Sequence, residues 1–192
     1  FEVTSTKEIK NEKGKMEKEV FYFSYDYPSQ TLTHLKDKEK DPKRLSWGSI
    51  SPDKKTVVYA KDLNLYRMSY EDYQKARKDE KDSTIVEIQI TDDGVKDFGY
   101  GMPYKTVNTD TLCNGKRRAV YGMWSPDSRY FVTVLTDERA VKDLWVLNVM
   151  SNPRPTLETY KYQMPGEKEA PVDHLYIFDM QDNSRKEIRT SA

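Results

Sequence analysis

Short runs of β-branched and aromatic residues, each preceded by a turn, mark the central part of the chain. Residues 57–59 (VVY) and 131–134 (FVTV) are two such runs, and this composition favours β-strands. Residues 85–91 (IVEIQIT) alternate apolar and polar positions with a period of two and lead into Asp-Asp-Gly at 92–94, which is typical of a strand that ends at a turn. The pattern therefore predicts short antiparallel strands joined by tight turns.

The turn before two of these runs has the same sequence. Ser-Pro-Asp occurs at residues 51–53 and again at 125–127. Proline presets φ for the first corner of a turn, and serine and aspartate side chains can bond nearby backbone groups. Alignment on the two turns brings Ile50 over Trp124, and we expect these two residues to occupy equivalent positions just before the turn.

The repeat continues downstream of the turns. Val58 lies over Val132, and the segment DLNLY at 62–66 resembles DLWVL at 143–147, with DHLYIFD at 173–179 as a third version of the same strand. Several short antiparallel strands per unit, with the unit repeated, indicate the blades of a β-propeller. A β-sandwich is the main alternative, but it does not require the repeat.

The expected fold class is therefore all-β, a partial β-propeller of about three blades of antiparallel meander sheets. We expect residues 1–192 to form one domain, with repeat units at roughly 45–94 and 120–182. The two turn prolines lie 126 − 52 = 74 residues apart, more than the roughly 40 to 50 residues of a compact blade. Insertions must therefore be present.

Two segments are the candidates for these insertions. One is a short helix near 69–80, because Ser69 can cap it and Tyr70, Tyr73 and Ala76 share one face. The other spans residues 95–122, which contain four glycines and little periodicity. We expect this second insertion to be a long loop.

Composition excludes several function classes. Lys plus Arg and Asp plus Glu are both 32, so no net charge favours nucleic acid or an anionic membrane. No apolar run approaches the roughly 18 residues of a transmembrane helix, and we expect no membrane insertion. The lone Cys113 has no Cys or His around it at metal-ligand spacing, so we expect no disulfide, metal or cofactor. The charged segments 7–19 and 36–44 are interpreted as solvated surface.

Four separated motifs occur in the order found in one known family. They are Ser-Pro-Asp followed by a strand and Asn-Leu-Tyr (64–66), IQIT with Asp-Gly (88–94), Trp-Ser-Pro-Asp (124–127) and YKYQMPGE (160–167). Over roughly residues 45 to 182 the chain resembles the N-terminal β-propeller of dipeptidyl peptidase IV and its prolyl oligopeptidase relatives, which are serine peptidases.

This resemblance implies a non-catalytic role. In the family a separate C-terminal α/β-hydrolase domain holds the Ser-Asp-His triad, with its nucleophile in a Gly-x-Ser-x-Gly elbow, and no such elbow occurs here. The only histidines, His34 and His174, have no recognisable catalytic context, so we assign no catalytic residue. The implied role is to gate and position peptide substrates for the hydrolase domain, in a periplasmic or extracellular peptidase.

The family's propeller contributes a pair of glutamates, just before the second Trp-Ser-Pro motif, that bind the α-ammonium group of the substrate. Residues 95–122 contain no Glu, and their only acids are Asp97 and Asp110. Substrate-binding residues are therefore unassigned, and we expect the intact protein to show weak preference for release of dipeptides. Arg117 and Arg118, with Lys116, could contact a substrate carboxylate, although a solvated loop is the simpler interpretation.

The turns depart from the family in one position. Lys54 and Ser128 stand where the family usually has Gly after Ser-Pro-Asp. Either each turn is strained by about 1 kcal/mol, because a residue other than Gly takes a positive φ, or the turn is of another type.

The remaining expectations concern the function and the assembly of the chain. A stand-alone propeller that serves as an interaction scaffold is the alternative function, and a Gly-x-Ser-x-Gly segment downstream in the parent reading frame would decide for the peptidase. An enzyme formed by these 192 residues alone has little support. An incomplete ring leaves apolar blade faces and strand edges such as residues 175–179 exposed, so we also expect self-association.

Overall fold

The computed structural model describes two compact units of the chain, residues 1–43 and 44–192. The described residues are 2–10, 16–35, 45–102 and 112–189. The charged segment 36–44 lies outside them, and the expected single domain over 1–192 stays a prediction. In this described part no helix is both long and apolar enough to cross a bilayer.

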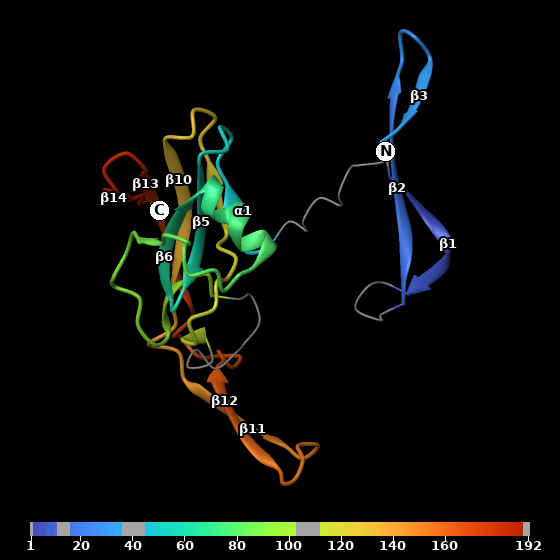
Figure 1. The fold of residues 1–192 in the computed structure, drawn as a ribbon. Coiled ribbons are helices and arrows are strands. Elements are labelled where there is room, and N and C mark those ends of the chain that lie inside the picture. Colours follow the sequence, from blue (N-terminus) through green and yellow to red (C-terminus); the bar gives the residue numbers. More distant parts are fainter. Residues whose placement is uncertain (1, 11–15, 36–44, 103–111, 190–192) are drawn as a thin grey trace. The chain divides into compact units, whose positions relative to one another are not determined.

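The first unit is a three-stranded antiparallel meander (Figure 1). In it β2 (Met16–Asp26) is the central strand and pairs with β1 (Glu2–Lys10) on one side and β3 (Thr31–His34) on the other. The ring of His34 stacks on that of Phe23, with 4.9 Å between the ring centroids.

The second unit begins with a four-stranded antiparallel sheet, which we call the first blade. Its strands follow chain order: β4 (Ser49–Ile50), β5 (Thr56–Lys61), β6 (Asn64–Ser69) and β7 (Ile88–Gln89). β7 is shorter than the alternation over residues 85–91 predicts, because only Ile88 and Gln89 pair with β6.

The second blade is built around β10 (Tyr130–Asp137), which pairs with β13 (Val172–Asp179), and β13 pairs with β14 (Arg185–Glu187). Residues 175–179 are therefore paired on both sides, and the expectation that they form an exposed strand edge is wrong. The other edge of β10 carries two short strands at different heights, β9 (Gly122–Trp124) and β8 (Phe98–Tyr100). The expectation that residues 95–122 form only a loop is therefore wrong at β8.

Strand register shows that the two blades are copies of one unit. Ile50 lies opposite Val57, and Trp124 lies opposite Phe131. The second pair is therefore the first pair shifted by 74 residues, which is the offset between the two turns. At the other edge, Tyr66 lies opposite Gln89, and its counterpart Tyr176 lies opposite Glu187. Ile50 and Trp124 therefore occupy the equivalent positions that the sequence predicts.

The third strand of the second blade is β13, so the alignment of residues 62–66 with 143–147 is wrong. Residues 143–147 instead lie in β11 (Asp143–Asn148), which pairs with β12 (Thr156–Lys161) as a two-stranded hairpin. The reason lies in burial: Phe178 on β13 is fully buried, whereas Trp145 on β11 is 68% exposed.

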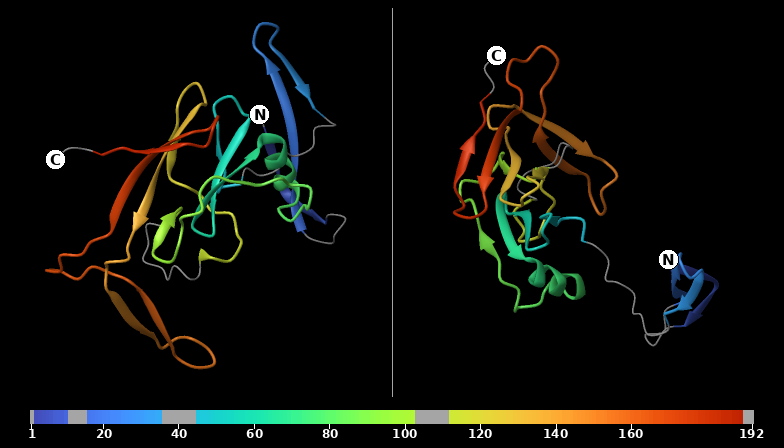
Figure 2. Two further views of the ribbon diagram at one scale, coloured as in Figure 1. Left: turned by 90° about the vertical axis from the view of Figure 1, so that its left-hand side faces the viewer. Right: turned by 90° about the horizontal axis from the view of Figure 1, so that it is seen from above.

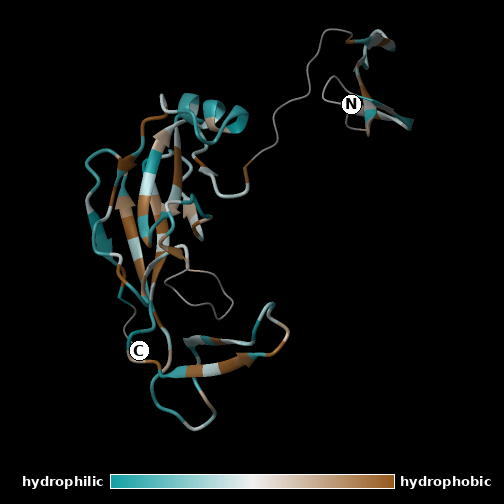
Figure 3. Cartoon of the chain, turned by 60° about the horizontal axis from the view of Figure 1, so that its bottom comes forward, coloured by the Kyte–Doolittle hydropathy of each residue, from teal (hydrophilic) through white to brown (hydrophobic). Residues whose placement is uncertain are grey.

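The hairpin β11–β12 extends away from the other strands of the second unit (Figures 1 and 2). The hairpin carries brown, hydrophobic segments in Figure 3, and large apolar side chains are exposed along it. They are Trp145, Leu147, Val149, Met150 and Leu157.

Two clusters of buried apolar side chains stabilise the blades. The larger one joins Val58, Ala60 and Leu65 of the first blade to Phe131, Leu135 and Phe178 of the second blade, together with other buried residues. The smaller one lies on the other face of β5, where Val57 and Tyr59 pack with Trp47. Alternation along β5 thus sends Val58 towards the second blade and Val57 and Tyr59 away from it.

Helix α1 (Tyr70–Lys78) covers this second face of the first blade. Ser69 is its N-cap, and the Ser69 hydroxyl accepts a hydrogen bond from the backbone N–H of Asp72 at 3.0 Å. Tyr73 and Ala76 are buried against Trp47 and Tyr59. The short helix expected near 69–80 is therefore confirmed.

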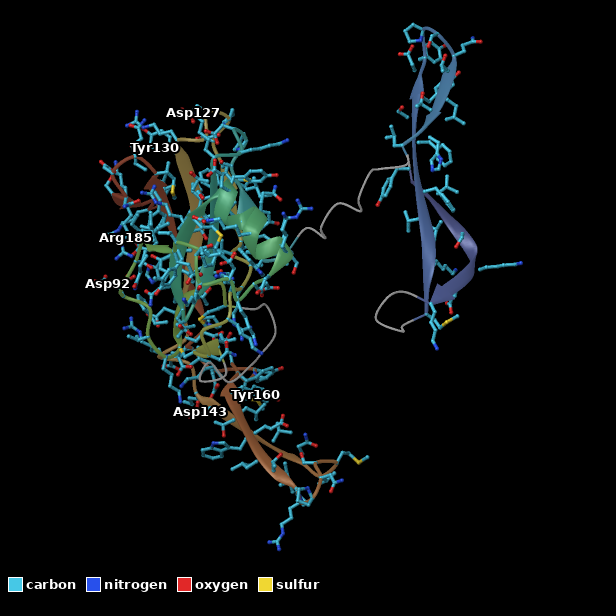
Figure 4. The ribbon with its side chains drawn as sticks, viewed as in Figure 1. Asp92, Asp127, Tyr130, Asp143, Tyr160 and Arg185 are labelled. Atoms are coloured by element: carbon cyan, nitrogen blue, oxygen red, sulfur yellow. The ribbon has the colours of Figure 1, made fainter. Side chains whose placement is uncertain are left out.

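The two Ser-Pro-Asp turns have matching hydrogen bonds. The Ser51 N–H donates to Thr56 O at 2.9 Å, and the Ser125 N–H donates to Tyr130 O at 2.8 Å. Each serine hydroxyl also bonds the carboxylate of the aspartate two positions later. Figure 4 labels Asp127 and Tyr130 in the second turn.

Both turns place a residue other than glycine in the left-handed region. φ is 56° at Lys54 and 63° at Ser128. Of the two alternatives for these positions, the strained turn is therefore the one present. The turns also touch, because the backbone N–H of Asp53 donates to the Ser128 hydroxyl at 3.0 Å.

Candidate functional site

Two neighbouring cavities of the second unit share the wall formed by Gly101, Met102 and Tyr121. The first has a volume of about 290 Å³ and the second about 450 Å³, which is near the size range of small-ligand sites. Charged side chains of opposite sign line them. We call them the acidic cavity and the basic cavity.

Gly101 fixes the shared wall close to the first blade. Its φ is +65°, and a Cβ atom built on it would lie 2.4 Å from the Cβ of Ala60. Only glycine fits both the left-handed backbone and this close approach. Because Gly101 has no side chain, the segment after β8 can lie directly against Ala60 of β5.

The basic cavity contains Arg117 and Arg118, together with Ser46, Trp47, Ala119 and the shared wall. The backbone of Arg118 pairs with that of Ala60 through two hydrogen bonds, of 2.9 Å and 2.7 Å. The guanidinium of Arg117 lies over the ring of Trp47, 5.4 Å from its centroid. The solvated loop expected for residues 116–118 is therefore wrong for Arg117, whose side chain is only 12% exposed.

The half-buried carboxylate of Glu87 orients Arg117. Glu87 accepts hydrogen bonds from Arg117 Nε at 2.7 Å, Lys61 Nζ at 2.6 Å and the Tyr59 hydroxyl at 2.7 Å. Burial acts to raise the pKa of Glu87, but the hydrogen bonds from Lys61, Tyr59 and Arg117 outweigh it and lower the pKa to about 2. Two cations face one carboxylate, so the cluster keeps a positive charge.

The acidic cavity contains Glu138 and Asp173, with Val134, Thr136 and Pro171. Burial raises the pKa of Glu138, and the nearby charge of Asp97 adds to this effect. The Thr136 hydroxyl donates to the Asp173 carboxylate at 2.7 Å. The cavity therefore offers two carboxyl groups in different environments.

Lys161 counters the negative charge beside this cavity. Its Nζ lies 3.7 Å from Asp97 Oδ2 and 3.1 Å from Asp143 Oδ1, and its side chain is only 16% exposed. Figure 4 labels Asp143 and Tyr160 at the base of the hairpin. Lys161 thus anchors the hairpin β11–β12 to the segment before β8.

The two histidines belong to different units of the chain. His34 lies in the first unit, whereas His174 lies on β13 of the second unit with its Nδ1 3.0 Å from Glu187 Oε1. Cys113 is exposed, and Asp110 lies outside the described residues. Among the described residues no group of three or more His, Cys, Asp or Glu side chains could hold a metal ion.

The sequence itself matches a known protein family. A model of the dipeptidyl peptidase IV N-terminal region matches residues 3–192. The chain belongs to this family.

Individual relatives are larger proteins. Probable dipeptidyl-aminopeptidase B of Aspergillus terreus is 28% identical over 173 residues, which cover 84% of this chain and 17% of that protein. The protein with the same description from Talaromyces stipitatus is 29% identical over 182 residues, which cover 89% of this chain and 18% of the relative. The chain thus spans less than a fifth of the length of these relatives.

A solved structure shows the same fold. The crystal structure of Porphyromonas gingivalis dipeptidyl peptidase 4 covers 100% of this chain with a TM-score of 0.55 and 19% sequence identity, and the match takes up 24% of that chain. The expected fold class, an all-β partial propeller with one short helix, is confirmed.

Sequence reasoning missed Glu138 and Asp173. They lie far along the chain from Gly101, and only strand pairing brings them to the shared wall, since Thr136 lies opposite both Gly99 of β8 and Asp173 of β13. The absence of Glu from residues 95–122 therefore does not leave the neighbourhood of β8 without carboxylates. No local sequence signal marks these two acids as members of a site.

Proposed function

We propose that this chain is a non-catalytic propeller segment of a dipeptidyl peptidase IV-like serine exopeptidase. It gates and positions peptide substrates for a separate C-terminal α/β-hydrolase domain, which carries out proteolysis. The observation that carries the proposal is the match of the family model to residues 3–192.

The charges of the two cavities support a role in positioning peptides. A free peptide is positive at its amino end and negative at its carboxyl end. The acidic cavity, with Glu138 and Asp173, and the basic cavity, with Arg117 and Arg118, share one wall. Such an arrangement can orient a peptide by charge before any bond is broken.

Contacts between the blades support a role in gating. The indole N–H of Trp124 on β9 of the second blade donates to the Ser49 hydroxyl on β4 of the first blade at 3.2 Å. Within its own blade Trp124 packs on Phe131, with 5.0 Å between the ring centroids, which fixes the indole at the seam between the two blades. A closed seam keeps bulky chains from passing between the blades.

The experiment compares two substrates of the intact protein that contains this chain. One is a short chromogenic peptide and the other is a large unfolded protein. Trp124→Ala loosens the seam, so we expect a several-fold higher rate on the large substrate relative to the short one. Trp145→Ala on the exposed hairpin is the matched control and should leave this ratio unchanged. An unchanged ratio in Trp124→Ala would contradict gating.

The same assay tests the length of the released product. We retain the expectation of weak preference for dipeptide release, because residues 95–122 contain no Glu. Mass spectrometry of the products measures this preference. Efficient dipeptide release that is lost in Glu138→Gln would show instead that the acidic cavity holds the substrate amine.

A stand-alone interaction scaffold remains the alternative function, and the exposed apolar side chains of the hairpin β11–β12 favour it. A downstream Gly-x-Ser-x-Gly segment followed by Asp and then His would decide for the peptidase. Self-association through exposed edges and a periplasmic or extracellular location belong to the proposal. Light scattering that shows only monomers at high protein concentration would contradict self-association.

A further inference from the structure

The basic cavity has the properties of an anion-binding site. Three separate segments form it: the approach to β4, the residues after β8 and the residues before β9. Among the described residues that line it, two are arginines and none is acidic. Its volume of about 450 Å³ accommodates a short peptide end.

Arg117 is held in place, and its guanidinium group keeps hydrogen-bond donors that a ligand can use. Its Nε bonds Glu87 at 2.7 Å, and its Nη1 donates to the backbone oxygen of Glu80 at 2.9 Å. A guanidinium group has five N–H donors, so these two bonds leave others for a ligand. Because Glu87 and Trp47 fix its orientation, Arg117 loses little freedom when it binds an anion.

Trp47 supplies a second, independent observation. It is only 7% exposed, and its Nε1 is buried with no hydrogen-bond partner among the described residues. An indole N–H can only donate, and buried donors are normally paired. Trp47 lines the same cavity as the two arginines. An acceptor from outside the described structure would satisfy this donor.

We infer that the basic cavity binds the C-terminal carboxylate of a short peptide through Arg117, Arg118 and Trp47. A carboxylate carries one charge and two acceptor oxygens, which suits guanidinium donors. The adjacent acidic cavity, with Glu138 and Asp173, disfavours a doubly charged phosphate because like charges repel across the shared wall. The choice of a peptide as ligand rests on the proposed function, whereas the anion site rests on the cavity alone.

Calorimetric titration of the 192-residue chain tests the ligand chemistry. The probes are N-acetyl-Ala-Ala with a free carboxylate and the same dipeptide as its C-terminal amide. Because the amide lacks the charge that the arginines bind, we expect the free carboxylate to bind about tenfold more tightly. Equal affinity for the two probes, or no measurable binding of the carboxylate probe, would overturn the inference. Inorganic phosphate that binds more tightly than the carboxylate probe would overturn the assignment to a peptide.

Variants locate the site. Arg118→Gln should weaken binding of the carboxylate probe about tenfold, and Arg118→Lys should weaken it less, because lysine keeps the charge but not the planar fork. Lys116→Gln is the matched control, since Lys116 is exposed and does not line the cavity. It should change the affinity less than twofold. Equal losses in Arg118→Gln and Lys116→Gln would show a diffuse charge effect and overturn the inference.

Trp47→Phe keeps the ring and removes only the N–H. It should weaken binding several-fold, and this variant replaces Arg118→Gln if circular dichroism shows that the latter is unfolded. Unchanged affinity in a folded Trp47→Phe would overturn the role of Trp47. Calorimetry does not depend on cleavage, so a failure here would leave the proposed function standing. Failure of the intact protein to cleave peptides would overturn that function without changing the binding result.

Discussion

Lys54 and Ser128 take the same left-handed backbone conformation, but their side chains differ in what they contact. The Lys54 side chain is exposed, whereas the Ser128 hydroxyl accepts a hydrogen bond from the Asp53 N–H at 3.0 Å. Replacement of a residue at positive φ by glycine removes the backbone strain and stabilises the folded state by about 1 kcal/mol. Loss of a hydrogen bond costs about the same amount.

Lys54→Gly should therefore raise the free energy of unfolding by about 1 kcal/mol, whereas Ser128→Gly should leave it nearly unchanged. Urea denaturation of the two variants measures the difference. Equal stabilisation by both substitutions would show that the hydrogen bond between the two turns contributes nothing.

Glu87 makes stability depend on pH in the acid range. Its pKa of about 2 in the folded state lies below the ordinary value of 4.5. A carboxyl whose pKa is lowered by folding stabilises the folded state above the unfolded pKa, and this stabilisation is lost as the pH falls through the folded pKa. The contribution of Glu87 is therefore complete above about pH 4.5 and declines between pH 4.5 and 2.

Glu87→Gln should lower the free energy of unfolding by about 2 kcal/mol at pH 7, because Lys61 and Arg117 then lack their shared counter-charge. The cost should shrink as the pH falls from 4.5 to 2. Thermal unfolding across this range measures it, with Glu169→Gln at an exposed site as the control. A cost that does not change with pH would contradict the role assigned to the charge of Glu87.

At the level of elements, the hairpin β11–β12 contributes no residue to either buried cluster. Leu144 and Tyr160 lie directly opposite each other in its ladder, so a two-residue Asn-Gly turn can join them. Replacement of residues 145–159 by Asn-Gly should leave the thermal midpoint of the second unit within a few degrees and increase solubility. Retention of Asp143 and Lys161 keeps their ion pair. Loss of cooperative unfolding would show that the hairpin supports the blades.

Some elements could be predicted from the local sequence alone, and others could not. Helix α1 was predictable because its cap and its buried face are encoded within a few residues, from Ser69 to Ala76. The third strand of the second blade was not predictable, since residues 143–147 and 173–179 are both typical strands. Only burial of Phe178 between the blades selects β13, and burial depends on contacts far apart in the chain.

For the whole molecule, the repeated turns predicted the partial propeller because both copies carry the same hydrogen bonds at a fixed offset. The two cavities were harder to predict from the sequence. Arg117 and Arg118 were singled out from the sequence, but the glutamate and tryptophan that orient Arg117 come from other segments. Charged residues in the sequence identify candidate groups for a binding site. The pairing of strands in the sheet determines which of these groups lie close together.

The proposed function assigns catalysis to a separate domain and gives this chain the role of gating and positioning the substrate. The most direct test is labelling with a serine-directed phosphonate, applied to the intact protein and to the 192-residue chain, followed by mass spectrometry of the digested products. We expect one labelled serine outside residues 1–192 and no label on the chain alone. Stoichiometric labelling of any serine within residues 1–192 would contradict it.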